Sequence, residues 1–321
     1  TDLVGRVNTA VAPLANRVVT RPGSAGRKLM EKVAGIAAER VLPPYARQRF
    51  STWFRRRGPA AVAAAPEGVT RDPAIVFPTC LVEYQATEVG KALVGVYERN
   101  GIACELPAGQ VCCGAPWLHQ GHLDEFRSLA EKNVAVLAGA IRAAEARGEQ
   151  PVVVVPQPTC GYILKQDYPD YLATDDARLV AEHTRDACEH LVAVHKEGGG
   201  LDTDFGGTTP ESVTYHAPCH LRAQNIGLKS RDLLKLTGTK ITVVSECSGI
   251  DGTWGYRQEN FDASRQVAKK MANAIDKADN DAVAGDCHLA NGAIVQETGK
   301  RPSHPVQFLA RAYAIPEEGT P

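Results

Sequence analysis

The residues of this chain best suited to chemistry are its cysteines. Two of them, Cys112 and Cys113, are adjacent and are followed by Gly114, in the string VCCGAP. The second half of the chain has a similar string, ECSGIDG, in which Cys247 is followed by Ser248 and then by glycine. Thiolates are soft ligands that suit zinc or iron–sulfur clusters. The two strings therefore predict a duplicated metal-binding unit whose second copy has lost cysteines.

Seven of the nine cysteines fall into two sets. The first set is Cys80, Cys112, Cys113 and Cys160, and the second is Cys219, Cys247 and Cys287. Cys104 and Cys188 fit neither set and are interpreted as packing residues, a common role for buried cysteine. Two adjacent cysteines can ligate two different irons of a cluster more easily than one tetrahedral zinc ion. The first set therefore favours an iron–sulfur cluster, most readily of the 4Fe–4S type, while zinc in one site stays open.

The second set offers three thiolates, so it must take a fourth ligand from elsewhere or leave an iron open. His220 and His288 each follow a cysteine directly and are the candidate ligands. The alternative is that they form hydrogen bonds at the site or are exposed at the end of a strand. Ser248 is a poor ligand at neutral pH and is interpreted as a hydrogen-bond donor to sulfur. Gly114 and Gly249 are expected to let the backbone pass close to a cluster.

Composition narrows the class of protein. The chain has 321 residues, of which 44% are hydrophobic and 23% are charged, and its net charge is −1. These values are typical of a soluble globular protein with two domains, and they exclude a strongly basic nucleic-acid binder as the overall class. No run of about 18 apolar residues and no secretory signal is visible, so we expect reduced thiols in a cytoplasmic protein. Because the chain begins with Thr1 inside a helical pattern, we interpret it as a piece of a longer protein.

Strand and helix patterns alternate in both halves. Short apolar runs end at or near a cysteine, and amphipathic stretches separate them. The predicted strands are 74–80, 102–106, 151–160, 212–219, 240–247 and 281–287, and the predicted helices are 88–100, 123–147, 230–236, 261–278 and 305–313. This alternation predicts an α/β fold with two related domains, 74–200 and 201–321, each built on a small parallel sheet. Ligands collect beyond the carboxyl ends of such strands, so the cysteines of each half should converge.

A basic helical region precedes these domains. Residues 1–57 hold 12 Lys and Arg against three acidic residues, a net charge of +9, and the alanine- and proline-rich stretch 58–73 is predicted to be a linker. Apolar residues recur with helical spacing, for example at Leu3, Val7, Val11 and Leu14. Residues 1–73 are therefore predicted to form a helical arm. It could lie on an anionic membrane with Trp53 and Phe54 dipping in, or pack against the domains or against another protein of the same complex.

At this point the motifs support a resemblance. The strings PTCLVEY, VCCGAPW, HAPCH, ECSGIDGTWGY and GDCHLANGA resemble the cysteine-rich CCG domains of the heterodisulfide reductase family and, more closely, those of the iron–sulfur component of anaerobic glycerol-3-phosphate dehydrogenase and its relatives. The family pattern has a cysteine, a Cys-Cys-Gly and a Cys-x-x-Cys in each domain. Here Gln157, Ser248 and Ala290 stand where cysteines would be, so neither domain has all five thiols.

The resemblance implies an iron–sulfur electron-transfer protein. Such a protein takes electrons from a flavin dehydrogenase, of the glycerol-3-phosphate or 2-hydroxy-acid type, and delivers them to quinone or another acceptor, at the inner face of the cell membrane. A rubrerythrin-like redox partner is the alternative, and no nucleic acid is expected. Two other functions stay open: an enzyme that reduces a disulfide or small substrate at a cluster, and a structural zinc protein. Asp251, Trp254 and Tyr256 could line a substrate or quinone pocket, although core packing is the preferred interpretation for the two aromatic residues.

Overall fold

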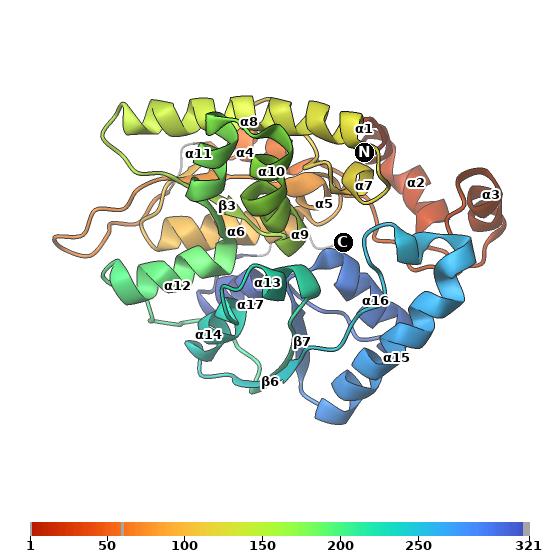
Figure 1. Ribbon diagram of the computed structural model, residues 1–321. Coiled ribbons are helices and arrows are strands. Elements are labelled where there is room, and N and C mark those ends of the chain that lie inside the picture. The colour runs from red at the N-terminus through yellow and green to blue at the C-terminus, as the bar shows by residue number, and fades with distance from the viewer. Residues whose placement is uncertain (1, 59–60, 317–321) are drawn as a thin grey trace.

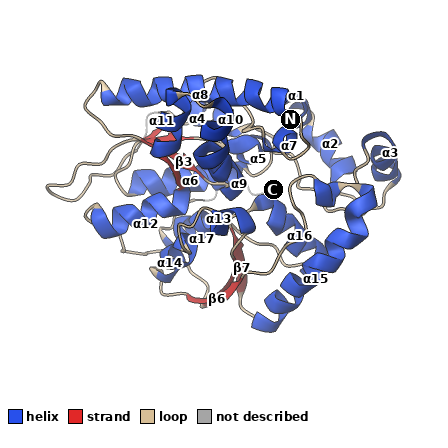
Figure 2. Ribbon diagram, in the orientation of Figure 1, coloured by secondary structure: helices blue, strands red, loops and turns tan. Residues whose placement is uncertain are grey.

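The computed structural model describes residues 2–58 and 61–316 and contains two small parallel sheets. Helices surround both sheets, with the first sheet in the upper half of the view and the second in the lower half (Figures 1 and 2). The first sheet has the strand order β2-β1-β3-β4 and the second has the order β6-β5-β7. The strands are β1 Ala74–Val76, β2 Cys104–Glu105, β3 Val152–Val155, β4 Thr184–Asp186, β5 Ser212–His216, β6 Lys240–Val244 and β7 Ala282–Gly285.

The two sheets repeat one topology, which confirms the predicted α/β fold with two related units. In each unit the first strand in the sequence is central and pairs in parallel with the second strand on one side and the third on the other. The first sheet has one further strand, β4, beside β3. The predicted strands were too long, because each ends before its cysteine. Cys219, for example, is the first residue of a helix that follows β5.

Helices make up most of the chain. The amino-terminal region holds α1 Asp2–Ala10, α2 Ala12–Val19, α3 Ala25–Ala34 and α4 Phe50–Arg56. The first sheet is surrounded by α5 Thr79–Tyr84, α6 Thr87–Arg99, α7 Ala115–Leu118, α8 Leu123–Glu145, α9 Pro158–Tyr162, the π-helix η1 Ile163–Asp167, α10 Tyr168–Leu172, α11 Asp175–His183 and α12 Ala187–Glu197. The second sheet is surrounded by α13 Cys219–Ala223, α14 Lys229–Lys235, the 3₁₀ turns η2 Trp254–Tyr256 and η3 Gln258–Asn260, α15 Phe261–Ala278, α16 His288–Thr298 and α17 Pro305–Ala312.

One hydrophobic core connects the two sheets. Helix α17 packs against α6 of the first unit, and buried Val306 and Leu309 belong to the same cluster as Leu93 and Tyr97. Helix α14 packs in turn against α12. The division of the chain at residue 200 stays a prediction, since this core includes residues from both sides of it.

The amino-terminal region is fastened to both units rather than free. Arg40 is 1% exposed, and its guanidinium donates a hydrogen bond to Ser264 Oγ at 2.8 Å while it lies 4.6 Å from the centre of the Phe261 ring. Trp53 and Phe54 pack against the core of the first unit, so the expectation that they dip into a membrane is wrong.

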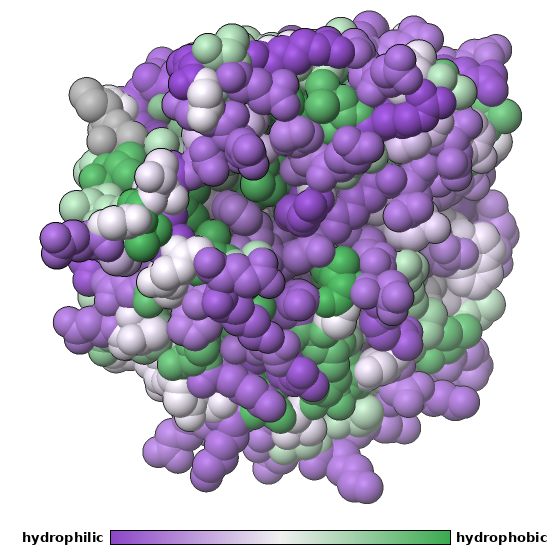
Figure 3. Space-filling model, turned by 60° about the vertical axis from the view of Figure 1, so that its left-hand side comes forward, coloured by the Kyte–Doolittle hydropathy of each residue, from purple (hydrophilic) through white to green (hydrophobic). Residues whose placement is uncertain are grey.

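The apolar residues of this region instead face solvent along α1 and α2. Leu3 is 76% exposed, Val7 54% and Leu14 62%, and Val4, Val11 and Val18 are also exposed. On the face shown in Figure 3, in contrast, polar side chains predominate and apolar ones form scattered patches. Helix α1 nevertheless packs against α5 of the first unit through Gly5, so the alternative that the helical arm packs on the domains holds for α1, although its apolar row is exposed. Among the described residues, no helix is both long and apolar enough to cross a bilayer.

Candidate metal centre

The structure brings the four thiols of the first set together. Cys80 lies in α5, just after β1, while Cys112 and Cys113 lie between β2 and α7. Cys160 lies in α9, just after β3, and its Sγ is 3.2 Å from that of Cys113. Cys112 forms hydrogen bonds to both Cys80 and Cys113. The thiols therefore converge beyond the carboxyl ends of three neighbouring strands, which is where the sequence predicted them.

Two buried polar side chains hold the Cys-Cys-Gly turn. Asn133 of α8 accepts a hydrogen bond from Val111 N at 2.8 Å and donates to Cys112 O at 3.2 Å. Tyr168 of α10 donates to Cys113 O at 3.0 Å. Neither Asn133 nor Tyr168 was singled out from the sequence. The available signal was an asparagine at a position that the helical period places among apolar residues, and a buried asparagine usually has a specific hydrogen-bonding role.

Asp2 is a third contact that sequence reasoning missed. Its carboxylate accepts a hydrogen bond from Cys112 N at 3.0 Å and another from Tyr84 Oη at 3.1 Å. Since Asp2 is the first residue of α1, this helix lies directly against the first set of thiols. Thr79, next to Cys80, has a φ of 61°, a strained value for a β-branched residue. This residue begins α5, the helix that carries Cys80.

The glycines of the two strings lie where another helix comes very close. Gly114 has a φ of 90°, and a Cβ there would lie 2.7 Å from the ring of Phe126 in α8. Gly249 has a φ of 72°, and a Cβ there would lie 2.2 Å from Ser264 O in α15. In both units the glycine is thus required by the close approach of the following long helix. That the glycines also let the backbone pass close to a cluster stays a prediction.

The residues of the first set fit an iron–sulfur cluster. A 4Fe–4S cluster needs four thiolates, and four are gathered here. Hydrogen bonding to Cys112, followed by burial, raises the pKa of Cys80 well above its usual range. Hydrogen bonds to Cys112 and Cys160, together with burial, do the same to the pKa of Cys113. Thiols whose pKa is raised in this way ionise only when a cation compensates the negative charge of the thiolate. The irons of a cluster are such cations.

The second set converges only in part. Cys219 and Cys247 are exposed and hydrogen-bonded to each other, and Gly249 N donates to the sulfur of Cys247 at 3.4 Å. Cys287 is buried, and burial raises its pKa to about 11, while the backbone N–H groups of Ala290 and Leu289 act in the opposite direction. The charge of Cys160, a thiol of the first unit, also raises the pKa of Cys287. The assignment of Cys287 to the second site stays a prediction.

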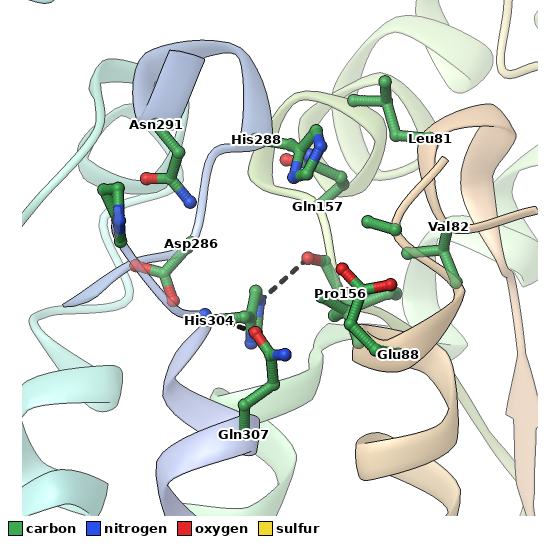
Figure 4. A pocket seen from close by; sticks show the side chains of 13 residues that line it. Leu81, Val82, Glu88, Pro156, Gln157, Asp286, His288, Asn291, His304 and Gln307 are labelled. Carbon is green, nitrogen blue, oxygen red and sulfur yellow. Dashed lines mark hydrogen bonds between the residues drawn. The ribbon is translucent and has the colours of Figure 1, made fainter. Parts of the chain in front are cut away.

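The two candidate histidine ligands have other contacts. His220 Nδ1 lies 3.2 Å from Thr159 Oγ1, and its ring stacks on that of His119 with centroids 6.0 Å apart. His288 points into a small cavity between the units (Figure 4). Within residues 2–58 and 61–316, no three or more His, Cys, Asp or Glu side chains are placed to hold a single metal ion. Ligation by either histidine stays a prediction without support from these contacts.

The cavity beside His288 has a volume of about 50 Å³ and is lined by both units. The side-chain amide of Gln157 has one orientation in which both its nitrogen and its oxygen form hydrogen bonds. In this orientation the nitrogen donates to Asp286 O at 3.2 Å and the oxygen accepts from His288 N at 2.9 Å. His304 Nδ1 accepts from Val306 N, so its Nε2 carries the proton and donates to Pro156 O at 3.0 Å (Figure 4). Gln157 thus spans the backbone on either side of Cys287.

Strand register explains why Gln157 has this position. Val152 of β3 and Ala282 of β7 occupy equivalent places beside the central strands β1 and β5. Counting along the chain from these two residues makes Gln157 equivalent to Cys287, and Cys160 equivalent to Ala290. Each unit has therefore kept a different member of the same Cys-x-x-Cys pair. Gln157 occupies a cysteine position and uses its amide to join the two units.

Asp251 and Trp254 line an open cleft of about 570 Å³, together with His119. Trp254 is 40% exposed, so the core interpretation is wrong for this residue. Tyr256 does not line the cleft but packs against the core around Val283, so the core interpretation holds for it.

Comparison with known proteins agrees with this geometry. The family model described as "Cysteine-rich domain" matches residues 74–165 and 213–290, one match in each unit. The chain belongs to the cysteine-rich domain family. The C subunit of anaerobic glycerol-3-phosphate dehydrogenase from Escherichia coli (strain K12) is 31% identical over 316 residues, which cover 98% of this chain and 76% of that protein.

Two further relatives match a smaller part of the chain. The B subunit of fumarate reductase (CoM/CoB) from Methanothermobacter marburgensis is 30% identical over 216 residues, 66% of this chain and 39% of that protein. Lactate utilization protein A from Bacillus thuringiensis is 27% identical over 237 residues, 70% of this chain and 92% of that protein. Membership of the cysteine-rich domain family, together with the converged thiols, makes this chain an iron–sulfur electron-transfer protein of the dehydrogenase and reductase type.

Proposed function

We propose that this chain carries electrons from a flavin dehydrogenase to an acceptor through a 4Fe–4S cluster held by Cys80, Cys112, Cys113 and Cys160. The observation that supports this most directly is the convergence of four thiols at the ends of three strands. The bound cluster would supply the one-electron chemistry. The protein's own part is to fix the thiols through Asn133 and Tyr168 and to keep most of the site away from water.

Metal analysis of one substitution tests the proposal. Cys113→Ser removes one of four ligands, so iron and acid-labile sulfide per chain should fall by the content of one cluster. The corresponding electron paramagnetic resonance signal of the anaerobically purified, reduced protein should be lost with it. Cys104→Ser is the matched control, since it changes another buried thiol that lies outside the first set.

The same measurement separates the alternatives. A colourless protein that contains zinc and no iron would contradict electron transfer and would support a structural zinc site. Equal iron content in the Cys113→Ser and Cys104→Ser variants would show that the four thiols do not hold the cluster.

We further propose that α1 and α2 attach the chain to the cytoplasmic face of a membrane. Their exposed apolar residues form a row at positions 3, 7, 11, 14 and 18, and the region that carries them has a net charge of +9. Exposed apolar side chains flanked by basic ones suit the interface of an anionic bilayer.

Vesicle binding tests this attachment. Leu14→Glu puts a carboxylate in the row without removing a buried contact, so co-sedimentation with anionic phospholipid vesicles should fall about tenfold or more. Val267→Glu on α15, at a residue that is 45% exposed, is the matched control and should bind as the wild type does. Equal loss in both variants, or none in either, would contradict attachment through α1 and α2.

A further inference from the structure

Cys287 is buried, unlike the other two thiols of the second set. It is 8% exposed, close to the 7% of Cys160 in the first unit, whereas Cys219 and Cys247 both reach solvent. In its exposure Cys287 therefore resembles the thiols of the first set rather than the two with which its sequence position groups it.

The segment that leads to Cys160 is held by the second unit. The carbonyl groups on either side of Gln157 accept hydrogen bonds from side chains of that unit, at 3.0 and 3.1 Å. The side chain of Gln157 itself bonds to the backbone on both sides of Cys287 (Figure 4). Gln157 O also accepts the first hydrogen bond of α9, from Gly161 N at 2.9 Å, so Cys160 lies within one helical turn of Gln157. One short segment thus connects the two thiols across the interface.

The amino end of α16 is directed at Cys287. Cys287 is the N-cap residue of this helix, and the backbone N–H groups of Leu289 and Ala290 bond to its sulfur. N–H groups directed at a sulfur stabilise a thiolate, and such bonds are one means by which proteins tune iron–sulfur clusters. Cys160 is close enough for its charge to act on Cys287. The surroundings of Cys287 are therefore those of a thiolate beside the first metal centre.

We propose that Cys287 is a fifth thiol of the first metal centre, supplied by the second unit and positioned by Gln157. The inference rests on the proposed electron-transfer function and deepens it, because the centre that carries the electron is then shared by both units. Strand register makes position 157 equivalent to position 287, so the second unit supplies its thiol next to the place where the first unit has an amide. Four thiols already satisfy the irons of a 4Fe–4S cluster, so Cys287 alters the electronic properties of the cluster rather than deciding whether it forms.

Electron paramagnetic resonance of the anaerobically purified full chain tests the proposal. The signal that Cys113→Ser abolishes identifies the first cluster. Cys287→Ser should keep the iron and sulfide of that cluster, because four thiols remain, but it should change the shape of its signal and shift its midpoint potential. Cys247→Ser is the matched control, since it changes another thiol of the second set and should leave the signal of the first cluster as in the wild type.

Gln157 is tested as a positioning residue. Gln157→Leu removes both hydrogen bonds to the backbone beside Cys287, so it should change the signal of the first cluster as Cys287→Ser does. Gln224→Leu is the matched control. It also removes a hydrogen bond across the interface, but one made to Pro158 O at 3.1 Å. Both substitutions should weaken the contact between the units, whereas only Gln157→Leu should alter the signal.

A double variant makes the outcome decisive. Gln157→Cys combined with Cys287→Ser returns a thiol to the centre from the first unit, at the equivalent position, so the shape of the wild-type signal should reappear. A purely structural effect of Cys287→Ser would not be reversed in this way. A first-cluster signal that is the same in Cys287→Ser and the wild type, or no recovery in the double variant, would overturn the fifth thiol.

Failure here is distinguishable from failure of the electron-transfer function. If Cys113→Ser removes a cluster while Cys287→Ser leaves its signal unchanged, only the fifth thiol is wrong. If the wild type holds no iron, the electron-transfer function fails as well.

Discussion

Among single residues, two buried carboxyl groups have the most unusual environments. Burial, and then the charge of Asp286, raises the pKa of Asp186 to about 7. Burial raises the pKa of Asp286 to about 6, although hydrogen bonds from Ser230 and Tyr215 oppose this. Both groups hold their protons in the folded chain at pH values where an unfolded aspartate, with its ordinary pKa of 3.8, has lost them. Their contribution to stability is therefore complete below about pH 4 and is lost as the pH rises to about 7.

Two buried histidines change stability with pH in the opposite direction. Burial lowers the pKa of His304 to about 3 and that of His288 to about 4. Both are neutral in the folded chain, while unfolded histidine, with its ordinary pKa of 6.5, takes up protons below that pH. Their contribution is present above about pH 6.5 and is lost as the pH falls towards 4. Other buried groups add to both effects: burial raises the pKa of Asp167 to about 6 and lowers that of His190 to about 4.

Asp286→Asn separates the two effects. The variant lacks the proton that Asp286 releases, so the unfolding free energy of the wild type minus that of the variant should fall by about 1 kcal/mol between pH 5 and pH 7.5. Urea titration at the two pH values measures this difference. Asp124→Asn, at a side chain that is fully exposed, is the control and should show no such change. A difference for Asp286→Asn that stays constant over this range would contradict the raised pKa.

The residues of the metal centre could be predicted unequally well. The four thiols could be identified from the sequence, because cysteine is the residue type that supplies thiolate ligands and the spacing placed each one after a predicted strand. The contact of Asp2 with Cys112 spans 110 residues, and an aspartate near a helix start usually has only a local role. Asn133 and Tyr168 looked like ordinary helix residues. The proximity of Cys287 to Cys160 depends on how the two units pack, which no pattern within one unit contains.

Among the elements, α1 depends on a single close contact. A Cβ on Gly5 would lie 2.4 Å from the ring of Tyr84, so the helix can lie this close only with glycine there. Gly5→Ala should push α1 away from Tyr84 and cost about 1 to 3 kcal/mol of unfolding free energy, as overpacking usually does. It should also separate Asp2 from Cys112 N and so shift the midpoint potential of the first cluster.

Gly139→Ala is the matched control for this substitution. Gly139 is also within a helix, α8, but a Cβ there would have no atom within 4 Å. This change should stabilise the chain by about 0.5 to 1 kcal/mol, because alanine forms helices more readily than glycine. Urea unfolding and redox titration of both variants measure the effects. A Gly5→Ala variant as stable as Gly139→Ala would show that α1 does not need the contact with Tyr84.

Element prediction succeeded where the pattern was long. The helix 261–278 has the predicted bounds, and α8 ends two residues before its predicted end. Residues 161–200 received no element, although they form helices and the strand β4. This strand has three residues, one of them the exposed Arg185, so its sequence has no apolar run. In α1 and α2 the helical period of the apolar residues was predicted correctly. The period alone does not tell whether the apolar side of a helix faces a core or the solvent.

For the whole molecule, α17 makes the two units depend on each other. Leu309 is 1% exposed in the core that both units share, so Leu309→Ala should cost about 2 to 5 kcal/mol of unfolding free energy. Leu29→Ala, at a side chain that is 63% exposed, is the control and should cost little. Because the core is shared, both units should unfold in a single transition. Leu309→Ala should lower the urea concentration at the midpoint of that one transition.

Tryptophan fluorescence can follow each unit separately. A background that keeps only Trp117 reports on the first unit, and one that keeps only Trp254 reports on the second. In both backgrounds Leu309→Ala should lower the urea midpoint by the same amount. Two separate transitions, or a shift seen by one tryptophan alone, would mean that the units are stable independently of each other.

The packing of α17 against α6 also sets the order of events while the chain is being synthesised. Domains commonly fold as the ribosome extends them, the amino-terminal one first. Here the core around Leu93 and Tyr97 is complete only when residues 305–312 have left the ribosome, more than a hundred residues after the first unit has been translated. Until then α6 lacks its contacts with α17, so this part of the first unit's apolar surface stays uncovered. The thiols Cys113 and Cys160 belong to a separate hydrophobic cluster made only of residues from the first unit, and that cluster can form earlier.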